Sequence, residues 1–155
     1  MTITVQCPDP AATERLAGRL APLLHPGDLI LLEGDLGAGK TAFTQGLARA
    51  MGVTEAVTSP TFVLVNQYRT EAGGELVHVD VYRLERLSEV VDLALPEMLD
   101  DGAVVVVEWG ERAAAALPPD HLHIRITAGN GDERTFVLEP KGAAWEQRLA
   151  GVAVP

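Results

Sequence analysis

The chain has 155 residues, 47% of them hydrophobic, and its mean hydropathy of +0.13 is typical of a folded protein and excludes a disordered one. Its 22 acidic residues outnumber 12 basic ones, and the net charge of −10 argues against direct binding of DNA or RNA, which depends on clustered Lys and Arg. No apolar run approaches the ~20 residues of a membrane span, no secretion signal is visible, and one cysteine leaves no disulfide framework. We therefore expect one cytoplasmic domain over residues 1–155, without a membrane or DNA partner.

The first segment of the chain predicts a strand and then a helix. Apolar and polar residues alternate from Ile3 onward, as in a half-buried strand. Asp9 and Pro10 then offer a helix cap and a proline at the first helical position. Pro22 is expected to end this helix near Ala21, because proline cannot continue it.

The next segment contains the motif on which the functional prediction depends. Residues 34–41, Gly-Asp-Leu-Gly-Ala-Gly-Lys-Thr, match the pattern G-x-x-x-x-G-K-[ST], which wraps nucleotide phosphates. The apolar run 28–33 before it predicts a buried parallel strand. Phe43 and Leu47 after it share one face of a helix that should end at Gly52. Strand, glycine-rich loop and helix together are the context that this motif requires.

The residue types of this motif fit phosphate chemistry. Glycine lets backbone N–H groups approach an anion without a Cβ atom in the way, and the start of the helix adds unpaired N–H groups and a positive dipole end. Lys40 can reach the β and γ phosphates, and the Thr41 hydroxyl can bind Mg²⁺. The residues of this loop that we expect to contact the nucleotide are Gly34, Asp35, Leu36, Gly37, Ala38, Gly39, Lys40 and Thr41.

The middle of the chain predicts a hairpin followed by short helices. Residues 62–69 and 75–81 are strand-like on either side of a turn that contains glycine, so they predict a β-hairpin and hence a mixed sheet. Ser88 is expected to cap a short helix through Leu93, and Pro96 is expected to begin another helical turn.

The last third of the chain predicts a central strand and a second hairpin. The run 103–107 is the most apolar β-branched segment, as a central strand should be. We expect an alanine-rich helix after Trp109, a hairpin of strands 121–128 and 133–139, and a final helix that holds Trp145. This order of elements predicts an α/β fold, a P-loop NTPase-like three-layer domain with a mixed parallel and antiparallel sheet flanked by helices.

Two carboxylates are expected to complete the site. Ligands bind at the carboxyl ends of the strands in such sheets, and Asp80 and Glu108 both follow apolar strand residues. A nucleotide site needs groups that hold Mg²⁺ and position the attacking group, and these acids can do both. The predicted catalytic residues are Lys40, Asp80 and Glu108. The predicted metal ligands are Thr41, Glu108 and Asp80.

Three neighbouring features each allow two interpretations. His78 alternates with Asp80 along one strand, so it either orients that carboxylate or is a core histidine. Trp109 either covers the nucleotide pocket or fills the core. Ser59 and Thr61 lie in a loop that either contacts the γ-phosphate or forms a structural turn.

Four motifs, taken together, resemble one family. They are the 34–41 loop, Ser59-Pro-Thr-Phe62, His78-Val-Asp-Val-Tyr-Arg83 and Glu108-Trp109. In this order and spacing they resemble the bacterial TsaE (YjeE) family over nearly the whole chain. One departure is Ala42, where many members have a second threonine, so we assign that position no ligand role.

The resemblance implies a small Mg²⁺-dependent ATPase, weak on its own, that hydrolyses ATP to ADP and phosphate. Members of the family are required, with TsaD and TsaB, to form N6-threonylcarbamoyladenosine at position 37 of tRNAs that read codons beginning with adenine. By the same resemblance, Lys40 and Thr41 bind phosphate and Mg²⁺, and Trp109 lies beside the nucleotide. Asp80 and Glu108 serve the metal and the attacking water. The implied cofactors are ATP and Mg²⁺, and tRNA is met only indirectly, through the partner proteins.

Three other functions remain open at this point. A small-molecule kinase needs an acceptor pocket and usually an arginine-bearing lid, but the chain has no arginine cluster and short connections. A GTPase would carry an [NT]-K-x-D motif, and neither Lys40 nor Lys141 lies in one. A non-catalytic nucleotide-binding module would use the same binding residues, and only the presence of Asp80 and Glu108 favours turnover over it.

Overall fold

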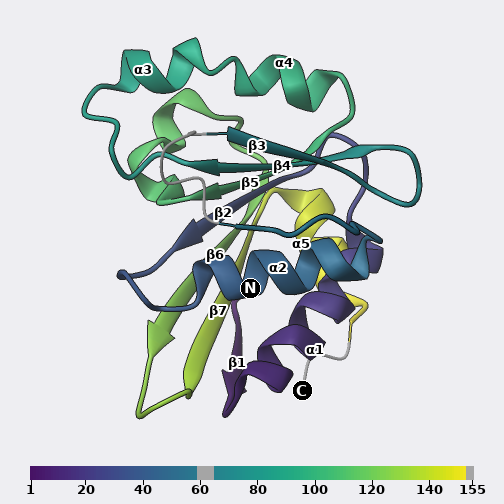
Figure 1. Ribbon diagram of the computed structural model, residues 1–155, viewed down its shortest axis with the longest axis vertical. Helices are drawn as coiled ribbons and strands as arrows, with labels where there is room; N and C mark the ends of the chain where they lie inside the picture. Colours follow the sequence, from purple (N-terminus) through teal and green to yellow (C-terminus); the bar gives the residue numbers. More distant parts are fainter. Residues whose placement is uncertain (59–64, 153–155) are drawn as a thin grey trace.

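Seven strands form one mixed sheet in the residues that the computed structural model describes, 1–58 and 65–152 (Figure 1). Their order across the sheet is β1-β7-β6-β2-β5-β4-β3. The strands are β1 Ile3–Cys7, β2 Leu29–Glu33, β3 Val65–Arg69, β4 Glu75–Asp80, β5 Val104–Glu108, β6 His121–Ala128 and β7 Arg134–Lys141. The central strands β6, β2, β5 and β4 are parallel, whereas β7 pairs antiparallel with β1 and β6, and β3 pairs antiparallel with β4. The predicted mixed sheet is therefore confirmed.

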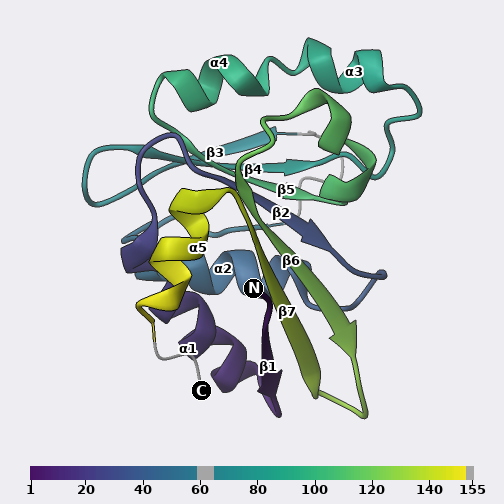
Figure 2. The same cartoon turned by 180° about the vertical axis from the view of Figure 1, so that it is seen from behind.

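Helices cover both faces of this sheet. They are α1 Pro10–Leu20, α2 Lys40–Ala50, α3 Leu87–Asp92, α4 Leu95–Asp100 and α5 Ala143–Ala150. In Figure 1, α3 and α4 lie above the sheet and α1 and α2 lie below it. The view from behind shows α5 on the same side as α1 and α2 (Figure 2). Each side has its own apolar cluster, so the predicted three-layer α/β arrangement is also confirmed.

The buried centre of the sheet follows from its sequence. Residues 29–32 and all of β5 are buried, as expected for parallel strands that are covered on both faces. Ile30 and Leu32 belong to the apolar cluster with α1 and α2. Leu29 and Leu31 belong to the cluster with α3 and α4, because successive side chains of a strand point to opposite faces. The strand that leads into the glycine-rich loop is thus held between two apolar layers.

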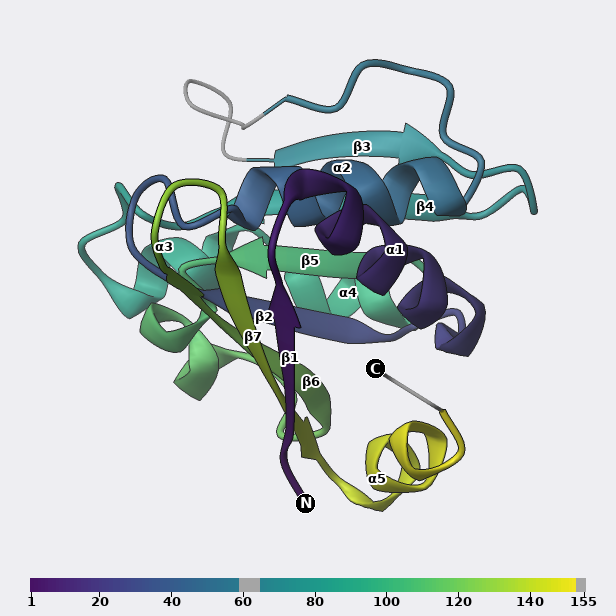
Figure 3. The same cartoon turned by 90° about the horizontal axis from the view of Figure 1, so that it is seen from below.

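The first helix begins and ends as its sequence predicts. The Asp9 side chain accepts a hydrogen bond from the Ala12 N–H at 2.8 Å, and Pro10 is the first helical residue. A short 3₁₀ turn, Ala21–Leu23, follows α1 and contains the proline that was expected to end it. Seen from below, α1 and α2 lie side by side across one face of the sheet (Figure 3).

Both predicted hairpins are present. β3 and β4 pair antiparallel across the turn, and β6 and β7 pair in the same way over eight residues each. Of the first hairpin strand, which was predicted to begin at residue 62, residues 62–64 lie outside the described residues. None of the helices in the two described ranges is long and apolar enough to cross a membrane.

The start of α3 differs from its prediction. Helix α3 begins at Leu87 and Arg86 is its N-cap residue, so Ser88 lies within the first turn instead of capping it. The Arg86 side chain makes no capping hydrogen bond. The Glu85 N–H donates to the Glu89 carboxylate at 3.2 Å, which explains why the chain turns into the helix before Ser88.

The predicted alanine-rich helix after Trp109 is wrong. That segment forms two 3₁₀ turns, Gly110–Arg112 and Ala114–Ala116. The cause is tertiary packing, since Gly110 lies so close to β2 that an added Cβ atom would come within 2.6 Å of the Leu31 Cβ atom. Intrinsic helix propensity is a weak preference, and such contacts override it.

Candidate active site

The loop between β2 and α2 has the backbone shape that anion binding requires. Gly37 and Gly39 have φ angles of 79° and 111°, which residues with a Cβ atom rarely adopt. Gly34 lies against β6, where a Cβ atom would come within 2.8 Å of the Ile126 carbonyl oxygen. Helix α2 begins at Lys40, so the N–H groups of its first turn have no acceptor within the helix and can serve a ligand.

The Lys40 side chain lies inside this loop and is only 5% exposed. Its Nζ atom donates to the carbonyl oxygens of Gly34 at 2.5 Å and Asp35 at 3.0 Å, and lies 4.0 Å from the centre of the Trp109 ring. Burial lowers the pKa of Lys40, and nearby carboxylates, with Glu108 the strongest, raise it in part. An anionic ligand in the loop would stabilise the charged ammonium and restore its pKa.

Asp80 and Glu108 lie side by side at the carboxyl ends of β4 and β5. The parallel pairing of these strands places the two residues directly opposite one another. Thr41, in the first turn of α2, donates its hydroxyl to Glu108 Oε1 at 3.4 Å. The carboxylates predicted from the sequence therefore meet the glycine-rich loop at the edge of the sheet where ligands of such folds bind.

The two acids differ in environment. Burial raises the pKa of Asp80, and the nearby charge of Glu108 raises it further. The Tyr82 N–H, which donates to Asp80 Oδ1 at 2.8 Å, lowers the pKa in part. Asp80 is half-buried, whereas Glu108 is 3% exposed. A carboxylate with a raised pKa is a better proton acceptor than an ordinary one, which suits Asp80 to a reaction that activates water.

The oxygen atoms of Thr41, Asp80 and Glu108 are of the kind that Mg²⁺ binds. Within the described ranges, no group of three or more His, Cys, Asp or Glu side chains forms a complete metal site. Mg²⁺ does not need such a group, because it usually binds one or two protein carboxylates together with substrate phosphates and water. The residues present can therefore hold Mg²⁺ that arrives with a phosphate ligand.

His78 contacts a different carboxylate from the one that its position suggested. It is fully buried, and its Nε2 atom lies 2.5 Å from Oε2 of Glu108, across the β4–β5 pair. The sequence interpretation paired it with Asp80, two residues along its own strand. The strand order decides the partner, because a neighbouring strand brings Glu108 within hydrogen-bond distance.

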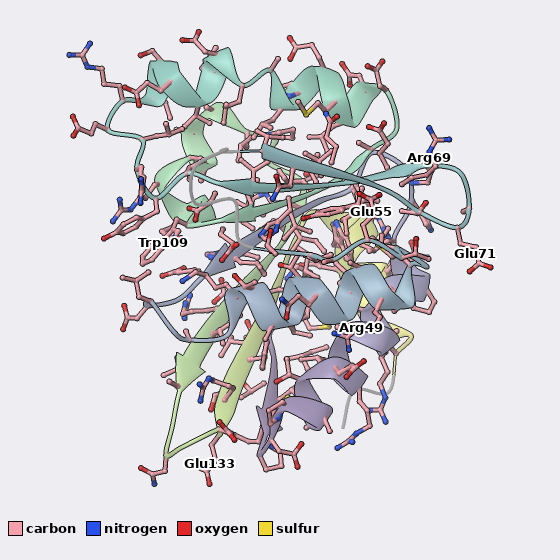
Figure 4. The ribbon with its side chains drawn as sticks, in the orientation of Figure 1. Arg49, Glu55, Arg69, Glu71, Trp109 and Glu133 are labelled. Carbon is pink, nitrogen blue, oxygen red and sulfur yellow. The ribbon has the colours of Figure 1, made fainter. Side chains whose placement is uncertain are left out.

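Trp109 packs on the core and also lines a cavity beside the glycine-rich loop, while its place over a nucleotide stays a prediction. Its φ of 63° turns the chain at the end of β5, and its ring packs 4.8 Å from that of Tyr82. The Arg112 guanidinium lies 5.1 Å from the centres of both rings. Trp109 packs against the apolar cluster under α3 and α4. It lies at the loop end of the sheet (Figure 4) and lines a cavity of about 310 Å³ together with Asp35 and Thr127.

One side chain at the loop carried no signal in the sequence. Arg134, at the start of β7, donates from Nη2 to the Gly37 carbonyl oxygen at 3.3 Å. Its Nη1 atom donates to the carbonyl oxygens of Gly131 and Glu133, both at 2.8 Å. Glu133 marks the tip of this hairpin in Figure 4. Only the antiparallel return of β7 brings Arg134 to the loop, so no local pattern could have identified it.

The predicted binding and catalytic residues lie together at one end of the sheet. Leu36 is 73% exposed and lines the cavity beside Trp109. Ala38 is 1% exposed and anchors the loop in the core. The Ser59–Phe62 segment, predicted either to contact the γ-phosphate or to form a turn, lies outside the described residues.

The sheet order, the β2–loop–α2 unit and the strand-end carboxylates define a protein with a P-loop NTPase-like α/β fold. A crystal structure of YdiB from Bacillus subtilis is similar to it, with a TM-score of 0.80 and 32% sequence identity. That similarity covers 97% of this chain and 93% of YdiB.

Sequence comparisons agree with this class and narrow it. The family model described as "Threonylcarbamoyl adenosine biosynthesis protein TsaE" matches residues 7–136. A tRNA threonylcarbamoyladenosine biosynthesis protein TsaE from Streptomyces coelicolor is 50% identical over 119 residues, which are 76% of this chain and 80% of that protein. Its counterpart from Bacillus subtilis is 41% identical over 138 residues, or 89% of this chain and 85% of that protein. The chain belongs to the TsaE family, as its four motifs predict.

Proposed function

We propose that this protein binds ATP with Mg²⁺ across Gly34–Thr41 and hydrolyses it to ADP and phosphate. The observation that carries the proposal is the arrangement at the start of α2. The Lys40 ammonium lies inside the glycine-rich loop, and the hydroxyl of Thr41, the next residue in the helix, donates to the Glu108 carboxylate. A cation, a hydroxyl and a carboxylate around a loop of backbone N–H groups form the set that phosphoryl transfer needs, because its catalysis is mainly positioning and charge stabilisation.

Each residue has a role that its contacts support. Lys40 exchanges its loop carbonyl partners for the β and γ phosphates, and the first-turn N–H groups of α2 hold the same phosphates. Thr41 and Glu108 present oxygens to Mg²⁺, which would neutralise charge on the phosphates. Asp80, with its raised pKa, orients the attacking water and draws its proton. Trp109 closes one side of the site over Lys40.

We further propose that this hydrolysis supports formation of N6-threonylcarbamoyladenosine in tRNA, at position 37 of tRNAs that read codons beginning with adenine. The names of the relatives from Streptomyces and Bacillus support that pathway. TsaD and TsaB are the proposed partners, and hydrolysis is weak without them. The net charge of −10 is consistent with contact to tRNA only through those partners, and the proposed compartment is the cytoplasm.

The test is phosphate release from Mg-ATP by the purified protein, alone and with TsaD and TsaB added. We expect stimulation by the partners. Lys40→Ala should abolish it and weaken ATP binding by roughly 1.5–3 kcal/mol, because it removes a charge-assisted contact. Lys141→Ala is the matched control. Lys141 is the last residue of β7 and pairs with Glu139, so its removal takes away a lysine that is not in the glycine-rich loop.

Two outcomes would contradict the proposal. Unchanged ATP affinity in Lys40→Ala would remove that residue from the site. Phosphate transfer that requires a small-molecule acceptor, with no stimulation by the partner proteins, would identify a kinase and leave the family likeness as one of fold.

A further inference from the structure

The role proposed for Glu108 leaves its buried partner, His78, without a function. His78 is 0% exposed, the Glu108 side chain is 4% exposed, and the atoms that join them are 2.5 Å apart. β4 and β5 are parallel neighbours. His78 lies opposite Val106, two residues before the end of β4 and on the same face of the sheet as Asp80. Leu76, Val104 and Val106 on the same face belong to the apolar cluster with α1 and α2, so the pair is enclosed on the side that faces α2.

The two oxygens of the Glu108 carboxylate have different partners. Oε2 faces the His78 ring, and Oε1 faces the Thr41 hydroxyl at 3.4 Å. A glutamate side chain has three rotatable bonds, so one hydrogen bond on the Thr41 side would leave the plane of the carboxylate free to turn. The imidazole of His78 is rigid and buried. Its hydrogen bond to Oε2 fixes that plane and leaves Oε1 directed at the start of α2.

The ring of His78 is committed to this contact. Its Nδ1 atom has no hydrogen-bond partner within residues 1–58 and 65–152, so in that part of the chain the ring serves only Glu108. A carboxylate accepts hydrogen bonds, which places the ring proton on Nε2. His121 is a contrasting buried histidine: its Nδ1 atom meets the backbone carbonyl oxygen of Pro118, three residues away. A histidine that only fills the core is expected to find such a backbone partner.

We propose that His78 is a positioning residue, which holds Glu108 in the orientation that lets Oε1 bind Mg²⁺ beside Thr41. His78 itself touches neither nucleotide nor metal. The proposal rests on the function proposed above and adds to it the residue that sets the geometry of the carboxylate. Partners of this kind, one shell away from a metal, commonly change metal affinity or activity by about 10–100-fold when they are removed.

The test compares three variants of the full chain. His78→Leu removes the hydrogen bond with little change in volume. His78→Gln keeps an N–H donor at about the same distance from the backbone as Nε2, so it is the conservative replacement. His121→Leu makes the same chemical change at a buried histidine at the opposite end of the parallel strands and is the matched control.

Three quantities are measured for each variant: the melting temperature, the ATP affinity by calorimetry with Mg²⁺ and with EDTA, and kcat and KM of phosphate release with TsaD and TsaB. We expect His78→Leu to lower kcat, and to reduce the gain in ATP affinity that Mg²⁺ provides, by about 10–100-fold. Affinity in EDTA should be unchanged, because the phosphate loop and Lys40 do not contact His78. His78→Gln should recover most of both losses, and His121→Leu should show neither.

Other results would overturn the positioning role. If folded His78→Leu keeps the wild-type kcat and Mg²⁺ dependence, His78 is a core histidine only. If losses in all variants follow the melting temperature, or if affinity in EDTA falls equally, the effect is structural. Failure of the proposed function would be seen in the wild type and is therefore distinguishable. If the wild type binds ATP more tightly with Mg²⁺ but releases no phosphate, it is not an ATPase, and the ATP affinities of the variants still test the role of His78. A wild type without Mg²⁺-dependent ATP binding removes both proposals.

Discussion

At the scale of single residues, burial displaces the pKa values of Lys40 and Asp80 in opposite directions. It lowers the pKa of the lysine and raises that of the acid, because in both cases the charged form loses hydration. Neither charge is fully compensated in the protein without ligand. The site therefore holds charged groups that bound phosphate and Mg²⁺ would stabilise. Without these ligands, the buried charges make the protein less stable than uncharged side chains at the same positions would.

Asp80→Asn should stabilise the protein while it suppresses turnover. The asparagine oxygen can still accept the Tyr82 N–H, but the cost of burying a charge beside Glu108 disappears. The gain should be a few tenths to about 1 kcal/mol, because Asp80 is only half-buried and solvent screens its charge. A carboxyl whose pKa is raised on folding costs stability above its folded pKa, and the cost vanishes below the unfolded value. Denaturant unfolding should thus show the gain at neutral pH and its loss as the pH falls toward 3.8. An equal or lower stability at neutral pH would contradict this account.

Glu108→Ala should separate binding from chemistry. ATP affinity without Mg²⁺ should be largely intact, since the loop and Lys40 hold the phosphates, whereas phosphate release should fall by roughly 100-fold or more. Calorimetry and a phosphate-release assay measure the two quantities. Glu14→Ala, which removes an exposed acid paired with Arg49, serves as the control and should change neither. Equal loss of binding and turnover in Glu108→Ala would count against the role assigned to Glu108.

At the scale of elements, the strand–loop–helix unit and the strand ends carry the site, and the short helices stand apart from it. Helix α2 starts at the loop because two glycines accept positive φ angles there, and β4 and β5 end beside it in register. Helix α3 has only six residues and starts at Leu87, and its N-cap residue, Arg86, makes no side-chain capping hydrogen bond. Its first turn therefore keeps N–H groups without a protein side-chain acceptor at the cap position.

Arg86→Ser should stabilise the protein through α3. Serine at the N-cap can accept a hydrogen bond from the N–H of the third helical residue, and with Glu89 it would complete an S-x-x-E capping box. The expected gain is roughly 0.5–1 kcal/mol, which for a chain of this size raises the melting temperature by about 1–4 °C. Arg86→Ala removes the same arginine without adding a cap, so it should give no such gain. A melting temperature equal in the two variants would mean that the cap is not formed.

At the scale of the whole molecule, the sheet has two different halves. Helices cover β2, β5 and β4 on both faces, whereas β6 and β7 expose one face with a network of charged side chains. On that face, Arg125 donates from Nη2 to Glu139 Oε1 at 2.6 Å, and its Nε atom lies 3.7 Å from Oε2 of Glu33. Glu33 is the last residue before the glycine-rich loop, so the open half of the sheet is connected to the candidate site through charges as well as through the backbone.

His121→Asn should make stability less sensitive to acid. Burial lowers the pKa of His121. The hydrogen bond to the Pro118 carbonyl oxygen raises this pKa in part, and the charges of His123 and Lys141 lower it further. Between the folded pKa and 6.5 the unfolded chain binds a proton that the folded chain does not, so stability falls as the pH drops through this window. Asparagine can keep the hydrogen bond to Pro118 but does not titrate. Urea unfolding between neutral pH and about pH 5 should show a shallower decline in the variant. Parallel curves would exclude His121 as a source of acid sensitivity.

Much of the fold and the centre of the site could be predicted from the sequence, because they depend on neighbours along the chain. The glycine-rich loop, its strand and its helix are contiguous, and so are both hairpins and the cap of α1 at Asp9. Asp80 and Glu108 could be placed at strand ends because each closes an apolar run. Family membership followed from the same short motifs. Each of these features has a local pattern whose physical cause lies within a few residues.

Other features were decided only when distant segments packed together. Strand order gave His78 the carboxylate of Glu108 rather than that of Asp80, and the return of β7 brought Arg134 to the loop. Contact between Gly110 and β2 replaced an alanine-rich helix with two 3₁₀ turns. The sequence by itself determined the glycine-rich loop and the elements that flank it, since their hydrogen bonds and apolar periodicity are local. Only the tertiary structure decided how the Glu108 carboxylate is held, because that depends on which strands become neighbours.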